Sequence, residues 1–379
     1  MPTNDLAARL KKARESAGLT IGEAASRLGF ANYQTLSNVE KGEREVKAGE
    51  LALFAKTYFC NLNTLLMGEA ESPSEVQLLW RKAPPEERKK EIEAYIKNRF
   101  EQYHLLEKLL GNDKVGPTQL TALTPADIRT NHQIDGLALR IGKWLDLGGR
   151  PALSLQRVME QSLQIKIVFM ELSDFGSAAS TVHSELGSAI VVNSEEAPWR
   201  SNFTLAHELF HILTWDTFSP NEIQRDEQLF SEMEKKAERF ASTLLLPESE
   251  VRQELSGRIV EQKLSFSDVV DIAREFGVST SALLYRMANL RIMTWEKANE
   301  LAKNDEFLKI DRRLRKDALC DTPRSERFIL LAVKCLRKGL ISHGKFAEIL
   351  DIDRADIDEF LEYRGLTRME GESVEIVAP

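Results

Sequence analysis

Apolar residues recur every three or four positions along much of the chain, which is the spacing of amphipathic helices. Over residues 5–68 this pattern is helical throughout and divides into short helices. Thr20 can cap one of them, Gly29 turns the chain, and residues 33–41 form the next helix. Two short helices joined by a glycine turn are typical of a helix-turn-helix unit. The sequence therefore predicts an all-α N-terminal domain, residues 1–68.

The pattern changes three times after this domain. Residues 69–127 are rich in charged residues and contain proline breaks, which predicts a charged helical linker. Residues 128–290 combine short apolar strands, at 165–170 and 188–193, with longer helices. Residues 291–379 are helical again, with a role that the pattern does not indicate. We therefore predict a multidomain, mainly α protein with a central α+β domain.

The helix expected in the linker has an apolar stripe. Its members lie close to heptad spacing: Ile92, Ile96, Tyr103, Leu106 and Leu110. Such a stripe could pair with a second copy of the chain in a homodimer. The alternative is a helix that packs on a neighbouring domain of its own chain.

Composition narrows the class of protein. The 379 residues carry a formal charge of −8 and are 42% hydrophobic, so the chain can bury a substantial core. We expect a cytoplasmic protein without a membrane partner, because no apolar run reaches the length of a membrane helix and charges interrupt the N-terminal stretch. Cys60, Cys320 and Cys335 lack Cys-x-x-Cys spacing, which argues against a disulfide framework or a thiolate zinc cluster.

The strongest chemical signal is a His-Glu-x-x-His motif at His207, Glu208 and His211, inside an apolar helical run. Two histidines four residues apart share one helix face, so both imidazoles can reach one tetrahedral zinc ion. The chance of finding this motif in a chain with so few histidines is only about 0.01. Two histidines without a metal are the alternative, but burying three ionisable groups unpaired is costly. We therefore predict Zn²⁺ bound by both histidines, with Glu208 as the general base.

A zinc peptidase needs a third protein ligand, and the next predicted helix offers Glu234 and Glu238. They are four residues apart and so share a face. One could coordinate zinc while the other accepts the N–H of a site histidine and fixes its ring. Glu234 is the first choice as ligand, and Glu238 is the first choice as the partner that accepts the N–H of a histidine. The reverse assignment, and a solvated Glu238, stay open.

These motifs bring a family into view: the region of about residues 147–290 resembles the ImmA/IrrE metallopeptidases. The resemblance rests on Leu-Gly-Gly-Arg-Pro-Ala-Leu at 147–153, Ala-Ile-Val-Val-Asn at 189–193, the run at 197–211 that contains the histidines, and the Leu-Leu-x-Pro run ending at Pro247. It implies a zincin-like fold and a zinc-dependent endopeptidase that cuts a repressor-type protein in a stress or mobile-element response. The chain departs from the family pattern at Lys236, often acidic there, and at Glu238, usually asparagine or aspartate.

The strand at residues 188–193 then has two interpretations. It could pair with an extended substrate segment by β-augmentation. The alternative is an ordinary internal strand.

Residues 6–68 resemble the Xre family of helix-turn-helix domains, through Arg14-x-x-x-Gly18-Leu-Thr and Leu36-Ser-Asn-Val-Glu-Lys-Gly42. The resemblance implies operator DNA as a partner. The side chains expected to face the major groove are Tyr33, Gln34, Thr35, Ser37 and Asn38, while Lys41 and Arg44 would neutralise phosphates. This segment has nine basic and six acidic residues, which suits DNA. A module used only for protein contacts is the alternative.

Together these domains indicate a DNA-binding transcriptional regulator with a zinc-dependent endopeptidase domain. The alternative function is an Xre-type autoregulator or antitoxin of a toxin–antitoxin pair. In that case the metallopeptidase fold would serve binding, and the partner would be a cognate toxin.

Overall fold

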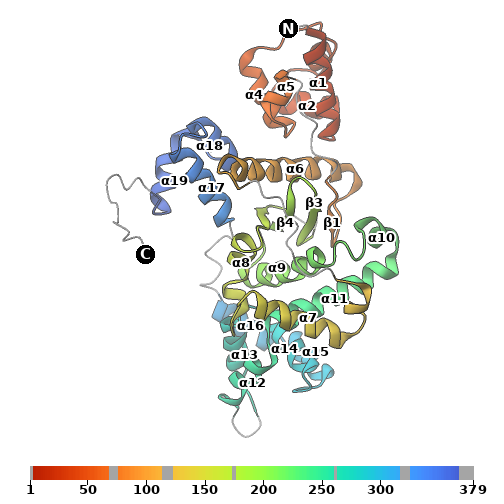
Figure 1. Ribbon diagram of the computed structural model, residues 1–379, viewed down its shortest axis with the longest axis vertical. Helices are drawn as coiled ribbons and strands as arrows, with labels where there is room; N and C mark the ends of the chain where they lie inside the picture. The colour runs from red at the N-terminus through yellow and green to blue at the C-terminus, as the bar shows by residue number, and fades with distance from the viewer. Residues whose placement is uncertain are drawn as a thin grey trace. The chain divides into compact units, whose positions relative to one another are not determined.

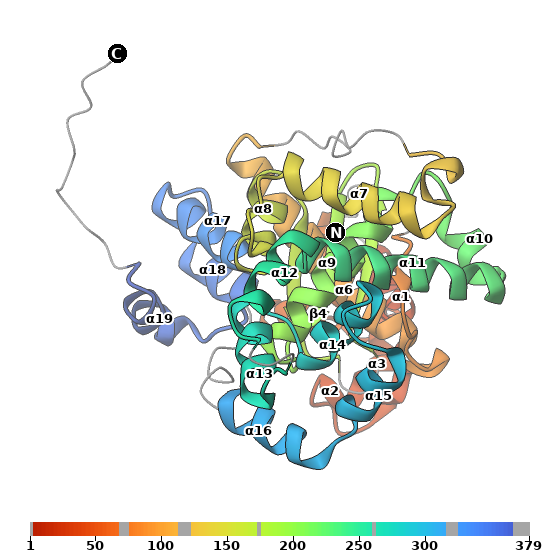
Figure 2. The same ribbon diagram turned by 90° about the horizontal axis from the view of Figure 1, so that it is seen from below.

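The computed structural model describes residues 3–67, 76–112, 123–172, 176–259, 263–315 and 325–366. They belong to two compact units: one lies within residues 1–101 and 114–325, and the other within 102–113 and 326–379. Helices dominate both, and the first also contains a small sheet (Figures 1 and 2). The prediction of a multidomain, mainly α protein with a central α+β domain is confirmed.

The N-terminal domain consists of five short helices: α1 (Thr3–Ser16), α2 (Ile21–Arg27), α3 (Tyr33–Glu40), α4 (Ala48–Thr57) and α5 (Leu62–Met67). Thr20 caps α2 as expected, because its side chain accepts a hydrogen bond from the Glu23 amide while the Glu23 carboxylate accepts from the Thr20 amide. Leu10, Leu36 and Phe54 are fully buried in one apolar cluster. The helix-turn-helix pattern of the sequence therefore corresponds to a packed domain.

A buried ion pair joins α1 to α3 in this domain. Arg14 Nε donates to Glu40 Oε1 at 2.6 Å, and Arg14 Nη1 donates to the main-chain oxygen of Leu19 at 2.8 Å. The two side chains are only 11% and 5% exposed. Burial lowers the affinity of Arg14 for its proton, but the hydrogen bond to Glu40 outweighs it and raises the pKa of the guanidinium. This ion pair links the two stretches that carry the helix-turn-helix resemblance, because one contains Arg14 and the other contains Glu40.

The sheet of the first unit has four strands in the order β1-β3-β4-β2. They are β1 (Leu79–Trp80), β2 (Lys166–Met170), β3 (Ala178–His183) and β4 (Gly187–Asn193). β2 runs parallel to β4, whereas β3 is antiparallel to both β4 and β1. The sequence pattern predicted β2 and β4 but missed the other two strands.

The position of β4 corrects one expectation. Ala189 pairs with Lys166 on one side and Thr181 on the other, so β4 is hydrogen-bonded along both edges. A substrate segment therefore cannot pair with residues 188–193, and the internal-strand interpretation is the right one.

Helices surround the sheet and complete one continuous core: α7 (Asn131–Trp144), α8 (Leu155–Gln161), α9 (Pro198–Leu213), α10 (Pro220–Arg225), α11 (Glu227–Leu245), α12 (Glu248–Ser256), α13 (Phe266–Glu275), α14 (Thr280–Asn289), α15 (Trp295–Ala302) and α16 (Asp305–Arg315). α11 packs on both α7 and α9 (Figures 1 and 2). The core begins at Leu79 and extends to Phe307. The core thus includes residues before position 128 and after position 290, which are the limits predicted for the central domain.

A polar network fixes α11 against α7 and α14. Asp135 accepts two hydrogen bonds from Arg239, at 2.9 and 2.6 Å, and a third from Thr243 Oγ1 at 2.8 Å. Arg286 is buried and donates to Thr243 and to the main-chain oxygen of Leu246. Buried polar groups are costly without partners, so this network specifies the register of α11.

The glycine-rich motif at residues 147–153 also has a structural role. Gly148 has a φ of +68°, a conformation that favours glycine, at the turn after α7. The Arg150 guanidinium that follows donates to Glu254 and lies 4.0 Å from the ring centre of Phe276. The motif therefore anchors this turn to α12 and to the end of α13.

The second unit combines the end of α6 (Glu86–Leu109) with α17 (Glu326–Arg337), α18 (His343–Leu350) and α19 (Ile357–Tyr363). The ring of Tyr103 lies 5.0 Å from that of Phe328, and Arg327 donates to Glu107 at 2.6 Å. Tyr103 and Leu106 are fully buried. The stripe expected to form a coiled coil is therefore buried within its own chain, and the alternative interpretation holds.

Two further observations concern the composition. Cys60 and Cys335 are free thiols, while Cys320 lies outside the described residues. None of the helices in the described part of the chain has the length and hydropathy of a membrane span.

We predict that Glu40→Ala destabilises the N-terminal domain by about 2–4 kcal/mol, because it leaves the buried Arg14 charge without its partner. Hydrogen exchange of the α1 and α3 amides in the full chain measures this loss. Glu15→Ala is the matched control, since Glu15 is exposed and lies 3.6 Å from the same arginine. Equal effects of the two substitutions would show that the buried pair does not hold the helices together.

Candidate metal centre and DNA-binding face

The His-Glu-x-x-His motif lies on α9, the helix beneath β3 and β4 (Figure 1). Pro198 starts this helix, where its missing N–H is no loss. His207, Glu208 and His211 are 0%, 2% and 3% exposed, so all three ionisable side chains are inside the protein. Removing these three groups from water costs free energy, so they need partners inside the protein that offset this cost.

Glu234 of α11 supplies the partner. Its Oε1 lies 3.1 Å from His211 Nε2, and its Oε2 lies 3.4 Å from His207 Nε2. The two Nε2 atoms are themselves 3.1 Å apart. These separations fit one tetrahedral zinc ion, because zinc bonds of about 2.0–2.1 Å place two ligand atoms about 3.3 Å apart. In the part of the chain that is described, this is the group of side chains that could hold a metal ion.

The protonation of Glu234 suits that role. Burial alone would raise its pKa, but hydrogen bonds and charges from His207 and His211 outweigh burial and hold the pKa well below its usual range. The donor set is then two imidazoles and one carboxylate, which is the set that catalytic zinc sites use with one position left open.

Three buried polar atoms of the site have no hydrogen-bond partner among the described residues. They are His207 Nδ1, His211 Nδ1 and Glu208 Oε2. An unpaired buried carboxylate oxygen costs free energy unless a bound molecule donates to it. The Glu208 carboxylate is therefore available to a water molecule or a substrate.

Glu238 lies differently from the expectation. Its side chain is half exposed, and its Oε1 accepts a hydrogen bond from Arg81 at 2.7 Å. It does not orient either histidine, because both Nδ1 atoms are unpartnered in the described structure. The physical reason is the competing cation, whose guanidinium neutralises the carboxylate. Among the described residues, Glu238 therefore contacts the site through Arg81, and a role in orienting a histidine remains a prediction.

Sequence reasoning missed Arg81. Its Nε lies 3.4 Å from Glu234 Oε2, so the arginine contacts the candidate third ligand as well as Glu238. It directly follows β1, more than 110 residues before the start of α9 in the chain. A local pattern cannot reveal such a contact, because the segment appears in the sequence as one more charged stretch of the linker.

The candidate DNA-binding face is the outer side of α3. Leu36 and Val39 are buried on its inner side, and Asn32 caps the helix by accepting from the Thr35 amide at 3.0 Å. Four of the expected DNA contacts are exposed on the outer side: Tyr33, Gln34, Asn38 and Lys41. The aromatic side chain of Tyr33 is 55% exposed. They are accessible, and their contact with bases or phosphates remains a prediction.

The other three expected DNA contacts are less free. Ser37 is partly buried, and the Thr35 hydroxyl donates to Asn32 Oδ1 at 3.1 Å. Arg44 donates to Glu50 at 2.7 Å, and its guanidinium lies 5.2 Å from the ring centre of Phe30. Its charge is thus compensated within the domain, which weakens the expectation that it binds phosphate.

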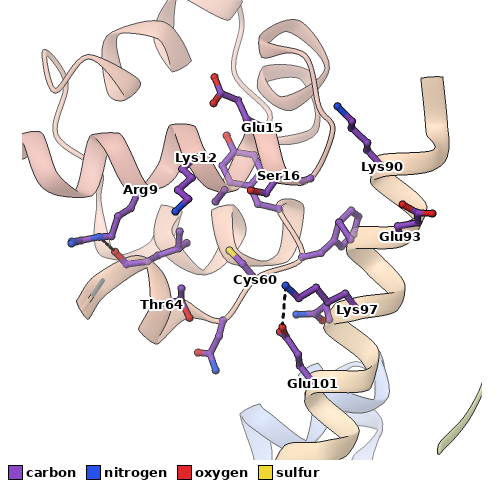
Figure 3. Close-up of a pocket in the computed structure, with 18 of the residues that line it drawn as sticks. Arg9, Lys12, Glu15, Ser16, Cys60, Thr64, Lys90, Glu93, Lys97 and Glu101 are labelled. Carbon is purple, nitrogen blue, oxygen red and sulfur yellow. Dashed lines mark hydrogen bonds and ion pairs between the residues drawn. The ribbon is translucent and has the colours of Figure 1, made fainter. Parts of the chain in front are cut away.

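A pocket lies between the N-terminal domain and α6, with a volume of about 890 Å³ (Figure 3). Basic and acidic side chains alternate along it, and Lys97 lies 3.9 Å from Glu101. Burial raises the pKa of the Cys60 thiol to about 12, so the thiol stays protonated. The mixed charges compensate one another, in contrast to the convergent donors of the metal centre.

Comparisons with known proteins match the two domains that contain these residues. Residues 160–288 match the family model of the IrrE N-terminal-like domain, a peptidase family, and residues 5–60 match a helix-turn-helix domain. No curated protein matches the chain. One similar solved structure is a Mycobacterium tuberculosis transcriptional regulator, with 18% identity and a TM-score of 0.32. The match covers 49% of this chain and 52% of the regulator, so the chain spans about half of its length.

The structure and the family matches coincide. The IrrE-like match includes the histidines of α9 and Glu234 of α11, and the other match covers α1 to α4. The chain therefore carries an N-terminal helix-turn-helix domain and, at residues 160–288, an IrrE N-terminal-like domain of a peptidase family.

Proposed function

We propose that this protein is a DNA-binding transcriptional regulator whose IrrE-like domain is a zinc-dependent endopeptidase. One observation carries the proposal: His207, His211 and Glu234 bring three ligand atoms together around one point, with Glu208 beside them in the same buried helix. A purely structural domain has no reason to bury this set of ionisable groups.

The three side chains would hold Zn²⁺ through two imidazole Nε2 atoms and the Glu234 carboxylate. When bound, zinc polarises a peptide carbonyl and lowers the pKa of a nearby water to about 7. The low pKa of Glu234 keeps its carboxylate ionised at all physiological pH values, so it remains a competent ligand.

Glu208 then moves the protons. Its unpartnered Oε2 takes a proton from the attacking water, whose oxygen bonds to the carbonyl carbon of the substrate. The same carboxyl group passes that proton to the amide nitrogen as the C–N bond breaks. The second proton of that water, left on the new carboxyl group, also passes to the amine, so the products are a carboxylate and an ammonium group, and atoms and charges balance.

The substrate that we propose is a repressor-type protein, cleaved in a stress or mobile-element response. Support for it comes from the resemblance to the ImmA/IrrE metallopeptidases and from a helix-turn-helix domain on the same chain. The N-terminal domain would bind operator DNA as a homodimer, because one recognition helix reads only half a site.

A second candidate function has its own support. Arg81 lies against Glu234 and Glu238, so a residue of the same chain already engages the metal centre. An autoregulator or antitoxin, in which this domain binds a cognate toxin and does not cleave, fits that observation. The two functions differ in whether they need Glu208 as a base.

For the metal centre, we predict that His211→Ala and Glu234→Ala lose almost all bound zinc, since each removes a direct ligand. Glu238→Ala should retain zinc with an affinity loss of no more than about 10-fold, the lower end for an outer-shell partner. Titration of the metal-loaded protein against a competing chelator measures the three affinities. If Glu238→Ala loses zinc as completely as Glu234→Ala does, the two glutamates exchange roles.

For catalysis, Glu208→Gln should keep the metal but cleave a denatured protein probe about 10²–10⁴-fold more slowly, because the amide cannot accept the proton. The paired measurement is regulation of a reporter gene in cells by the same variant. Loss of both activities with DNA affinity intact supports proteolysis. Normal regulation by the variant would instead support the binding function.

For DNA recognition, the double substitution Gln34→Ala with Asn38→Ala should abolish the preference for a selected operator over random DNA. Lys41→Ala should weaken both about equally and reduce the salt slope of binding by about one. Arg44→Ala is the matched control, expected to leave the salt slope unchanged because Glu50 already compensates that charge. An operator preference that survives the double substitution would overturn the assignment of α3 as the recognition helix.

A further inference from the structure

Arg81 is fixed in place by the residues on either side of it. Before it, Trp80 of β1 is buried and pairs with β3, and its indole N–H donates to Glu93 of α6 at 3.1 Å (Figure 1). After it, Lys82 lies against Gly176, where an added Cβ would be 3.1 Å from the Lys82 main-chain oxygen. The backbone therefore holds Arg81 at one position beside the sheet.

The guanidinium of Arg81 contacts two carboxylates of α11. Its Nε lies 3.4 Å from Glu234 Oε2, and its Nη2 donates to Glu238 Oε1 at 2.7 Å. The two glutamates are four residues apart, so they share a helix face. A guanidinium suits this position, because its planar fork of donors can serve two acceptors at once, whereas an ammonium group is a single point charge.

Glu234 is also the carboxylate that meets the histidines. Its oxygens lie 3.1 Å from His211 Nε2 and 3.4 Å from His207 Nε2, and its side chain is only 15% exposed. A carboxylate that binds a metal ion is itself held by hydrogen-bonding groups around it, which orient it toward the ion. In the described part of the chain, Arg81 is the arginine within ion-pair distance of Glu234. It is therefore the group that can orient this ligand.

We propose that Arg81 is a positioning residue of the metal centre: it orients the Glu234 carboxylate for the metal ion, and Glu238 holds the guanidinium in turn. This rests on the proposed function, because it takes Glu234 as the third zinc ligand. It adds that the centre is completed from outside residues 160–288, the range that matches the IrrE-like family model. The affinity for zinc, and not cleavage alone, is then a property that Arg81 controls.

The direction of the effect follows from two opposing contributions. A cation near the metal ion repels it, whereas an oriented ligand binds it more tightly. The repulsion is small here, because Glu238 neutralises the guanidinium and because the Arg81 side chain is 38% exposed to water. Orientation of Glu234 should therefore dominate, and loss of Arg81 should weaken zinc binding.

The test measures the zinc affinity of full-chain variants by competition with a chromogenic chelator. Arg81→Ala should bind zinc about 10–100-fold more weakly than the unmodified chain, which is the typical loss for an orienting partner. Arg81→Lys should fall between the two, because lysine keeps the charge but not the forked donors. Arg252→Ala is the matched control, since Arg252 of α12 pairs with Glu248 at the same distance of 2.7 Å and is 51% exposed.

A double variant tests whether Glu238 acts through Arg81. Glu238→Ala alone should weaken zinc binding by no more than about 10-fold, and it should cause no further loss in a chain that already carries Arg81→Ala. Two losses that simply add would show that Glu238 acts on the site by another route, and would overturn the link through Arg81.

Chemical rescue separates orientation of the ligand from correct folding. The Arg81 side chain is partly exposed, so solvent reaches this position. Free guanidinium ion, at a concentration far below the denaturing range, should restore part of the zinc affinity that Arg81→Ala loses. It should leave the affinity of Arg252→Ala unchanged. A chain that had misfolded would not regain zinc affinity in this way.

The outcomes separate the two proposals. If Arg81→Ala binds zinc as tightly as Arg252→Ala does, or more tightly, the inference is overturned. If the unmodified chain binds no more zinc than His211→Ala does, the metal function and the inference fall together. If zinc affinity responds as expected but the unmodified chain cleaves no protein, the inference stands and the peptidase function fails.

Discussion

The fold depends on one electrostatic requirement: the ionisable groups buried in α9 need polar partners inside the protein. His207 and His211 lie on one helix face with almost no exposure, and the nearest counter-charge comes from Glu234 on α11. Without that carboxylate the two imidazoles would face only each other. The pairing therefore requires α11 to lie against α9 in one register, which in turn makes the position of α11 the main requirement of the fold.

That register is set at the far end of α11. Arg239 and Thr243 both bind Asp135 of α7, and Thr243 also accepts from Arg286 of α14. Burial lowers the pKa of Arg286, which shows how strongly its surroundings are desolvated. A slip of α11 by one residue would break this network and withdraw Glu234 from the histidines together. Packing in the C-terminal half of α11 thus fixes Glu234 near its middle.

The sequence predicted what local periodicity and short motifs encode. The helices of the N-terminal domain, the strands β2 and β4, and the two histidines with Glu208 follow from spacing over a few residues. Long-range pairing was inaccessible to the same reasoning. β3 has a weakly apolar sequence, and β1 has only two residues, so neither shows an alternating pattern. The contact of Glu238 with Arg81 was inaccessible for a related reason, because Arg81 comes from a distant segment.

The segment that follows β1 leads directly into the N-terminal domain's contacts with α6. Glu91 of α6 accepts a hydrogen bond from Arg27 of α2 at 2.6 Å, and the ring of Tyr95 lies 5.3 Å from that of Phe59. One stretch of about fifteen residues therefore touches the metal centre at Arg81 and the helix-turn-helix domain at these positions. Coupling between two sites needs an element with two arrangements, and spatial proximity alone does not provide it. β1 itself is a fixed part of the sheet, because Leu79 and Trp80 are buried as well as paired with β3.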